Sequence, residues 1–374
     1  MFFLILAFYL TVDTLLGILL IPVNYQTFRT RHYYYHHGLR PAQSTFSRWN
    51  TEIYPFFTNS LGLRDKAARK IDKESGKRRL LIIGDSHTEG VDLPFEDTFA
   101  GILSIMGDSV DTEVLNAAVI SYSPKIYYLK LKYLLEKEKL KVNEVFCLID
   151  ISDIQNELVY EKFNPGEYSN FKQWTTMLTE FLKRRSFTVY ALNKIKTDLG
   201  RKAFYSRIQD FTVAGAEGNR FNTNSADLYY SFFSHFDDKV LLSNPRFHGV
   251  GEWLYDDFFK PLAEKGIQLG QQNIKKMKDL CDQHGIRLTI AVHPWYSQIY
   301  RRNPEDLYVK SWRTFAGNNG IDFINLFPLF VNEENPEITF QKYYIKGDNH
   351  WNAVGHARVA QYLAGKMILR KEEQ

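Results

Sequence analysis

Residues 80–86 read Leu80-Leu81-Ile82-Ile83-Gly84-Asp85-Ser86, and this stretch decides the fold of the 374-residue chain. Four consecutive apolar residues closed by a glycine are typical of a short strand buried on both faces of a sheet. Gly84 lets the backbone pass closely, and Ser86 then lies at a strand-to-helix turn on the carboxyl edge of the sheet, where ligands bind. Ser86 is therefore a candidate nucleophile, although Gly-Asp-Ser also forms ordinary turns and helix caps.

The rest of the chain alternates strand and helix patterns. Apolar runs of the buried-strand kind follow at residues 114–115, 145–149, 288–292 and 323–326. Helical periodicity, with apolar residues three and four apart, covers residues 124–139, 267–284 and 353–369. This alternation predicts an α/β fold with a parallel sheet.

Two segments do not follow this alternation. Residues 24–79 are rich in Tyr, His, Arg and Asn with little periodicity, which predicts a loop-dominated lead-in to a domain over residues 80–374. Residues 161–265 are rich in aromatic residues and in Asn, Gly and Pro, which indicates an insertion in that domain. The insertion either forms a lid or substrate-binding subdomain or adds helices to the surface, and the sequence leaves both open.

Composition limits the class of function. With 44% hydrophobic and 24% charged residues, the chain has the content of a folded protein. The formal net charge of +4 is small and the basic residues are dispersed, which argues against nucleic acid as a partner. Two cysteines, Cys147 and Cys281, cannot form a disulfide framework. The adjacent His36 and His37 indicate a metal only weakly, because no cluster with metal-ligand spacing accompanies them, so neither metal nor cofactor is expected.

The first segment, residues 1–23, is almost continuously apolar and long enough to cross a bilayer once. A cleaved signal peptide is the alternative, but the run lacks a preceding basic region and a small-x-small cleavage site, which favours an uncleaved anchor. Asp13 near its middle indicates either a partner helix in the membrane or a helix shifted toward one surface. Arg29 and Arg31 after it weakly favour a cytoplasmic main domain by the positive-inside rule.

A second chemical motif lies near the other end, in Lys346-Gly347-Asp348-Asn349-His350-Trp351-Asn352. Asp348 and His350 can present their side chains on one side of a loop, so that the carboxylate holds one imidazole nitrogen and the other nitrogen faces Ser86. The plainer interpretation makes Asp348 a turn former, Asn352 a helix cap and His350 a surface residue. The conjunction of this pair with a serine after the first strand favours the chemical interpretation.

Both ends together resemble the SGNH or GDSL hydrolases, in particular the branch whose last block reads Asp-x-His-Trp and which is related to alginate acetyltransferases. The first block is Leu81-Ile82-Ile83-Gly84-Asp85-Ser86-His87-Thr88-Glu89-Gly90, and the last is Asp348-Asn349-His350-Trp351-Asn352 followed by Gly355-His356. The resemblance implies a three-layer α/β/α sandwich with a parallel, flavodoxin-like sheet of about five strands. It also implies that Ser86 is the nucleophile, His350 the general base and then acid, and Asp348 its orienting carboxylate.

The same resemblance assigns an oxyanion hole and substrate contacts. The oxyanion hole would be the backbone N–H of Ser86 with donors from two middle blocks, in which Ser121 takes the place of a usual glycine and Ser152 that of a usual asparagine. Asn156 is the alternative to Ser152. Trp295 either stacks on a sugar or acyl group or packs in the core. The weaker candidates for substrate contact are Asn59 and Arg64, from a segment that resembles one upstream of the first block, and His293, Trp295 and Trp351.

These expectations combine into a serine-dependent acyl transfer. Ser86 attacks an ester, often an acetyl ester, and water or a sugar hydroxyl resolves the acyl enzyme, so the protein is an esterase or an O-acyltransferase. Resemblance to members that act on surface polysaccharides favours an acylated carbohydrate or acyl-donor substrate, a periplasmic domain on a membrane anchor, and a membrane acyl-transfer partner. The alternatives are a lipid or thioester hydrolase and a catalytically silent carbohydrate-binding or assembly protein, which the missing oxyanion asparagine favours.

Overall fold

The centre of the fold is an eight-stranded sheet with the strand order β10-β9-β8-β6-β7-β5-β4-β3. Five strands pair in parallel, namely β6 (Arg78–Ile83), β7 (Thr112–Asn116), β8 (Glu144–Ile149), β9 (Arg287–Val292) and β10 (Asp322–Asn325). Three add to the edge at β7 in antiparallel fashion, namely β3 (Ser44–Trp49), β4 (Glu52–Thr58) and β5 (Arg64–Asp65). The order β7-β6-β8-β9-β10 is flavodoxin-like, so the predicted parallel sheet is confirmed.

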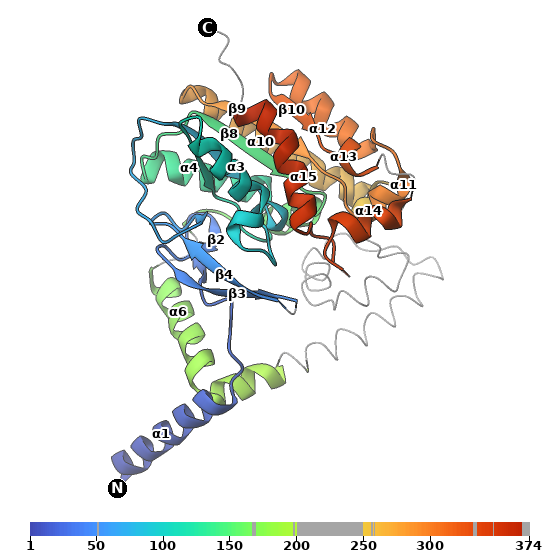
Figure 1. Cartoon of the computed structure of the whole chain (residues 1–374). Helices are drawn as coiled ribbons and strands as arrows, with labels where there is room; N and C mark the ends of the chain where they lie inside the picture. Colours follow the sequence, from blue (N-terminus) through green and yellow to red (C-terminus); the bar gives the residue numbers. More distant parts are fainter. Residues whose placement is uncertain are drawn as a thin grey trace. The chain divides into compact units, whose positions relative to one another are not determined.

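The computed structural model describes residues 1–50, 52–166, 170–196, 199, 250–255, 257, 259–331, 335–346 and 348–368 (Figure 1). Its remaining labelled elements are α1 (Phe2–Leu20), β1 (Arg29–His32), β2 (His36–Leu39), α2 (Ser86–Glu89), η1 (Phe95–Asp97), α3 (Phe99–Asp108), α4 (Pro124–Lys132), η2 (Tyr133–Lys137), α5 (Asp153–Tyr160), α6 (Asn170–Arg185), η4 (Val250–Tyr255), α10 (Lys260–Gln283), α11 (Tyr296–Arg301), α12 (Leu307–Asn318), α13 (Pro328–Val331), α14 (Pro336–Tyr343), α15 (Ala353–Leu363) and η5 (Ala364–Ile368).

Helices cover both faces of the parallel strands (Figure 1). α3 and α15 pack against each other on one face, with α3 against β7. α4, α5 and α10 pack together on the other face, where Gly270 of α10 lies against Trp312 of α12. Right-handed crossovers explain this split, because the chain reverses its direction across the sheet after β7. The predicted three-layer sandwich is therefore the observed one.

The predicted elements of the sandwich lie where the sequence placed them. Each of the five parallel strands begins and ends within two residues of its predicted position. The helix predicted over residues 124–139 is α4 continued by the π-helical turn η2, and the one over 353–369 is α15 continued by η5. α10 begins earlier than predicted, at Lys260.

The prediction of a loop-dominated lead-in over residues 24–79 is wrong for much of that segment. β3, β4 and β5 extend the central sheet, and β1 and β2 form a hairpin of their own. In β4, Tyr54, Phe56 and Thr58 are buried at every second position while the residues between them are more exposed. Such alternation marks a strand with one buried face, and it is hard to recognise here because aromatic and polar residues occur on both faces.

The chain divides into two structural units. Gln26–Pro165 and Leu241–Gln374 form the unit that contains the sheet, and Met1–Tyr25 and Gly166–Val240 form the other. Most of the predicted insertion over residues 161–265 lies outside the described residues, so its role stays a prediction. Within the described residues, α1 alone is long and apolar enough to cross a membrane, a property that membrane anchors and signal sequences share.

Gly84 joins β6 to α2 at a place where no side chain fits. A Cβ added there would lie 2.1 Å from Oγ1 of Thr88 and 3.1 Å from the carbonyl oxygen of Leu148. We expect Gly84→Ala to lower the free energy of unfolding by about 2 kcal/mol, because overpacking a tight site forces the backbone to move. Urea unfolding of the two purified proteins measures this difference.

Gly317 in α12 offers the matched control, because a Cβ added there meets nothing within 4 Å. Alanine at an open helical position should raise the free energy of unfolding by up to about 1 kcal/mol. Equal effects of Gly84→Ala and Gly317→Ala would contradict the close approach at Gly84.

Candidate active site

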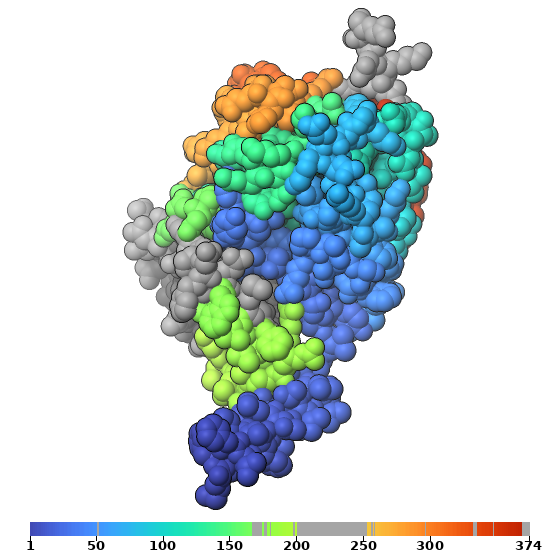
Figure 2. Space-filling model, turned by 90° about the vertical axis from the view of Figure 1, so that its left-hand side faces the viewer, coloured from blue at the N-terminus to red at the C-terminus, as the bar shows by residue number. Residues whose placement is uncertain are grey.

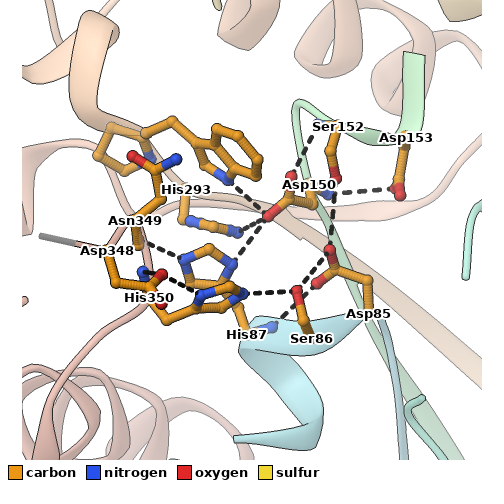
Figure 3. A network of polar contacts seen from close by, with 12 residues as sticks. Asp85, Ser86, His87, Asp150, Ser152, Asp153, His293, Asp348, Asn349 and His350 are labelled. Atoms are coloured by element: carbon orange, nitrogen blue, oxygen red, sulfur yellow. Dashed lines mark hydrogen bonds and ion pairs between the residues drawn. The ribbon is translucent and has the colours of Figure 1, made fainter. Parts of the chain in front are cut away.

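Ser86, His350 and Asp348 form a hydrogen-bonded chain at the carboxyl edge of the sheet (Figure 3). Ser86 is the first residue of α2, directly after the strand β6. Nε2 of His350 lies 2.8 Å from Oγ of Ser86, and Nδ1 of His350 lies 2.5 Å from Oδ1 of Asp348. Because the ionised carboxylate of Asp348 only accepts, Nδ1 carries a hydrogen and Nε2 is free to take the serine proton. The arrangement is the one that a serine nucleophile with a histidine base requires.

The loop that carries Asp348 and His350 is fixed at both ends by hydrogen bonds. The backbone N–H of Ile345 donates to the carbonyl oxygen of His350 at 2.9 Å, and the backbone N–H of His350 donates to Oδ1 of Asp348 at 3.1 Å. Asn352 then caps α15 by accepting from the backbone N–H of Val354 at 3.0 Å. The helix cap predicted at Asn352 and the chemical role predicted for its neighbours are therefore compatible.

The lead-in supplies two further side chains to this site. At the β3–β4 turn, the indole N–H of Trp49 donates to Oδ2 of Asp348 at 2.8 Å, and Nδ2 of Asn50 donates to the same oxygen at 3.0 Å. The indole also meets the ring of His350 edge-on, with 5.3 Å between the ring centroids. The sequence analysis missed both residues, because their only local signal is a Trp-Asn pair between two alternating segments.

Charge and burial set the protonation of the pair. Burial by itself would lower the pKa of His350, but the hydrogen bond to Asp348 and its negative charge outweigh burial, so this pKa lies above the ordinary histidine value. Burial would likewise raise the pKa of Asp348, but hydrogen bonds from His350, Trp49 and Asn50 hold it well below its usual range. The imidazole of His350 is therefore a stronger base than a free histidine.

A second, fully buried set of polar side chains lies beside this chain of residues (Figure 3). Oδ2 of Asp150, which follows β8, lies 3.0 Å from Nδ1 of His87 and 3.0 Å from Nε2 of His293. The indole N–H of Trp295 donates to the same oxygen at 2.7 Å, and the backbone N–H of Ser152 donates to Oδ1 at 2.7 Å. Burial opposes ionisation of Asp150, but its contacts with His293 and His87 hold the pKa of Asp150 well below the usual range.

His87 connects this buried set to the loop of His350. Nε2 of His87 lies 3.0 Å from the carbonyl oxygen of Asn349, the residue between Asp348 and His350. Because a carbonyl oxygen only accepts, Nε2 carries the hydrogen. Burial, and then the neighbouring His293, lower the pKa of His87 to about 4. His87 thus positions the loop through a hydrogen bond from Nε2, which the sequence analysis did not foresee.

His87, Asp150 and His293 are also the one group among the described residues whose ligand atoms lie close enough together to hold a metal ion, all within 4.8 Å of one another. Two histidine nitrogens and a carboxylate oxygen are ligands that zinc accepts. In this structure the N–H donors of Trp295 and Ser152 already hold the carboxylate of Asp150.

Two of the predicted oxyanion donors, Ser86 and Ser152, lie on two different turns at this edge of the sheet. The hydroxyl of Ser152 donates to Oδ2 of Asp85 at 3.4 Å, an oxygen that lies 3.3 Å from Oγ of Ser86. Burial, and then the charge of Asp150, raise the pKa of Asp85 well above its ordinary value. The role of the Ser86 and Ser152 N–H groups toward an oxyanion stays a prediction.

Ser121 follows β7 and has a φ angle of 59°, the left-handed conformation that glycine adopts most readily. This conformation explains why a glycine is usual at this position in proteins with a similar second block. The carbonyl oxygen of Ser121 accepts a hydrogen bond from the hydroxyl of Tyr160 at 2.8 Å. Its backbone N–H as an oxyanion donor stays a prediction.

Asn59 and Arg64, predicted as weak substrate contacts, are buried and bonded inside the protein. Oδ1 of Asn59 accepts the backbone N–H of Leu61 at 3.0 Å, and Arg64 donates to three carbonyl oxygens between residues 89 and 93. Their exposed fractions of 0% and 1% leave no surface for a substrate. We therefore correct their role: Arg64 supports the segment that follows Ser86, and Asn59 holds the turn that precedes Arg64.

The other three predicted substrate contacts differ in their exposure. His293 and Trp351 are completely buried, and Trp351 stacks on Phe330 with 5.4 Å between ring centroids, so both belong to the core. Trp295 is half-buried, with its indole N–H bonded to Asp150. Of the three, Trp295 alone keeps a surface that a substrate can reach.

Part of the chain that forms this site is similar to a known protein family. Residues 247–374, which contribute Asp348 and His350, match the family model described as an SGNH hydrolase-like domain of the acetyltransferase AlgX. The match to an SGNH hydrolase-like domain confirms the resemblance seen in the sequence. Within that class, the AlgX acetyltransferase domain is the particular family that this segment matches. No curated protein matches the chain significantly.

Several solved structures are similar to 79–80% of the chain at low identity. An alpha/beta hydrolase enzyme from the metagenome of Lake Arreo, Spain, has 10% identity and a TM-score of 0.37, with 80% of this chain and 99% of the other covered. An acetylxylan esterase from Geobacillus stearothermophilus has 11% identity and a TM-score of 0.37, with 79% and 96% covered. An esterase from Pseudoalteromonas sp. has 11% identity and a TM-score of 0.37, with 79% and 100% covered.

Proposed function

We propose that the protein is a serine-dependent acyl-ester hydrolase or O-acyltransferase. Ser86 attacks the acyl carbonyl, His350 takes the serine proton at Nε2, and Asp348 stabilises the imidazolium that forms. The leaving alcohol takes that proton, and water or a second hydroxyl then releases the acyl group from Ser86. The observation that carries the proposal is the continuous chain from Oγ of Ser86 through His350 to Asp348, with contacts of 2.8 Å and 2.5 Å.

The acyl group is in this proposal an O-acetyl group, and the substrate an acylated carbohydrate of the cell surface. Support comes from the match of residues 247–374 to an acetyltransferase domain. α1 would be an uncleaved anchor that keeps the catalytic unit outside the cytoplasm, where a membrane protein delivers the acyl donor. Its apolar length of 19 residues supports a membrane crossing.

An acyl-enzyme experiment tests this function. The full-length protein is mixed with a chromogenic acetyl ester, with and without an oligosaccharide acceptor, and quenched samples are examined by intact and peptide mass spectrometry. We expect one acetyl group on the peptide that contains Ser86. Acetate as the product would then identify an esterase, and acetylated sugar a transferase. Absence of the acyl enzyme together with background hydrolysis would overturn the proposal in favour of a carbohydrate-binding or assembly protein.

The contact between the β3–β4 hairpin and Asp348 leads to a separate prediction. We expect Trp49→Phe to lower kcat for ester hydrolysis about tenfold, because a hydrogen bond to a charged group contributes about 1.5–3 kcal/mol and phenylalanine cannot donate one. With one donor fewer, Asp348 holds the imidazolium more strongly, so the rising limb of the kcat/KM profile should move to higher pH. Steady-state kinetics across pH measure both effects.

Phe46 lies on the same hairpin with its side chain exposed, so Phe46→Leu is the matched control. It should leave kcat and the pH profile unchanged. The same loss of kcat in both variants would mean that the hairpin matters only for folding.

A further inference from the structure

The unit formed by Met1–Tyr25 and Gly166–Val240 carries exposed apolar side chains that the proposed reaction does not use. Phe181 in α6 is 59% exposed, and Leu192, in the helix over residues 187–196, is 63% exposed. At about 100° per residue, these side chains and their apolar neighbours form one stripe on each helix. The exposed apolar residues of the two stripes are Trp174, Leu178, Phe181 and Leu182 on α6, and Leu192 and Ile195 on the next helix. Stripes of this kind usually cover an apolar partner.

The second of these helices is bonded to the middle of α1. The carboxylate of Asp13 accepts the backbone N–H of Thr188 at 2.8 Å and the hydroxyl of Thr188 at 2.7 Å. The hydroxyl of Tyr9 donates to Oγ1 of Thr188 at 2.9 Å. Asp13 thus caps the first turn of the helix over residues 187–196, where the helix dipole favours a negative charge. Of the two explanations that the sequence left open for Asp13, the structure favours a partner helix.

The end of α6 approaches α1 at a glycine. A Cβ added to Gly17 would lie 2.2 Å from the carbonyl oxygen of Arg185, so a larger residue would push the two helices apart. Close approach at small residues is typical of helices that pack inside a membrane. Asp13 and Gly17 therefore lie on one side of α1 and hold the same turn of chain, residues 185–188.

The position of Asp13 along α1 sets the depth of this contact. The 19 residues of α1 measure about 28 Å, close to the hydrocarbon thickness of a bilayer of about 30 Å. Asp13 lies seven residues before Leu20, which is about 10 Å from that end of the helix. If α1 is inserted, residues 185–188 must lie at or below the level of the headgroups. Phe181 and Leu192 flank this turn and would then meet acyl chains.

Basic side chains accompany the apolar stripes. Lys183, Arg184 and Arg185 form the last turn of α6, and Lys194 and Lys196 lie on the next helix. Interfacial helices combine an apolar face with such basic residues, which attract anionic headgroups. Figure 2 shows the side chains of α1, in dark blue, at the molecular surface, and most of them are exposed. The stripes and α1 therefore both expose apolar side chains that a bilayer can cover.

We propose that α6 and the helix over residues 187–196 lie in the membrane interface beside α1, with their apolar stripes against the acyl chains of the lipid bilayer. The partner is lipid, because the chain between the stripes, residues 185–188, contacts Asp13 and Gly17 of a helix that itself has the length of a bilayer. This inference rests on the proposed role of α1 as an anchor. It gives the otherwise unfavourable charge of Asp13 a structural purpose.

Depth measurements on the full-length protein test this surface. The native Cys147 and Cys281 are completely buried, so a single introduced cysteine can carry an environment-sensitive fluorophore. The labelled positions are Phe181→Cys and Leu192→Cys on the stripes, Thr179→Cys and Asn193→Cys as matched controls on the same two helices, and Leu10→Cys in α1. The controls lie about 160° from Phe181 and about 100° from Leu192 around their helices. Each protein is placed in vesicles of phosphatidylcholine and phosphatidylglycerol with or without lipids that carry a quencher on the acyl chain.

We expect the quencher lipids to reduce the emission about twofold or more at positions 181, 192 and 10, and to leave positions 179 and 193 nearly unchanged, because only the stripes and α1 reach acyl chains. Quenching at position 10 with none at 181 and 192 would overturn this inference but leave the anchor intact. The same result is expected if another protein, and not lipid, covers the stripes. Absence of quenching at position 10 would overturn the anchor and this inference with it. Thermal melting of each variant confirms that the label has not unfolded the protein.

Discussion

The Ser86→Ala variant should hydrolyse a chromogenic acetyl ester at no more than about 10⁻⁴ of the wild-type rate, because alanine leaves His350 without a nucleophile to activate. Oγ of Ser86 is the atom that His350 contacts at 2.8 Å, and the neighbouring Ser152 hydroxyl is bonded to Asp85 instead. We therefore expect no other hydroxyl to replace Ser86. Initial rates at saturating ester, with both proteins in the same membrane mimic, measure the effect.

Ser109→Ala is the matched control, because Ser109 is an exposed residue at the end of α3 whose hydroxyl bonds only to the helix backbone. It should keep the wild-type rate. The free energy of unfolding of Ser86→Ala should also lie within about 1 kcal/mol of the wild-type value, as expected for a small change at a partly exposed position. A wild-type rate in Ser86→Ala would sink the serine mechanism, whereas background rates in all three proteins would favour the binding alternative.

Asp348→Asn should lower kcat by about 10³–10⁴-fold while the protein still folds. The amide cannot stabilise the imidazolium that His350 becomes, and it can favour the wrong ring tautomer. When the amide oxygen accepts from the N–H donors of Trp49 and Asn50, the NH₂ group faces Nδ1 of His350. Kinetics with the same ester measure the loss, and Asp108→Asn, at an exposed residue of α3, is the control expected to have no effect.

The dependence of kcat/KM on pH tests the same contact, because the direction in which its midpoint moves can be predicted. Catalysis needs the neutral imidazole of His350, so kcat/KM should rise with pH through its pKa. Asp348 raises that pKa, so the wild-type midpoint should lie above the ordinary histidine value of about 6.5. Removing the charge in Asp348→Asn should move the midpoint to lower pH. A flat wild-type profile between about pH 5 and 8 would contradict a histidine base.

Asp92 must be separated from His350 in this experiment. Burial, and then the charge of Asp348, raise the pKa of Asp92 to about 6, which is close to the ordinary histidine value of about 6.5. We expect Asp92→Asn to leave the midpoint of the rising limb in place. A midpoint that disappears in Asp92→Asn would assign the limb to Asp92.

The parts of this protein that the sequence determined by itself are those with a local cause. A four-residue apolar run closed by Gly84 needs burial on both faces and a tight turn, so the strand β6 and the position of Ser86 follow from nearest neighbours. The two-residue spacing of Asp348 and His350 likewise allows their contact whatever the rest of the chain does. The apolar length of α1 was equally plain.

Tertiary structure decided the contacts between residues that are far apart in the chain. Trp49 reaches Asp348 because β3 and β4 add to the sheet edge, and no local pattern records to which edge a strand will add. The same holds for Asp150 at the end of β8, which receives His87 and His293 from the ends of two other strands, β6 and β9. Such contacts depend on strand order and register, which are fixed only when distant apolar faces are buried together. The sequence therefore determined the reacting groups, and the packed sheet decided what surrounds and orients them.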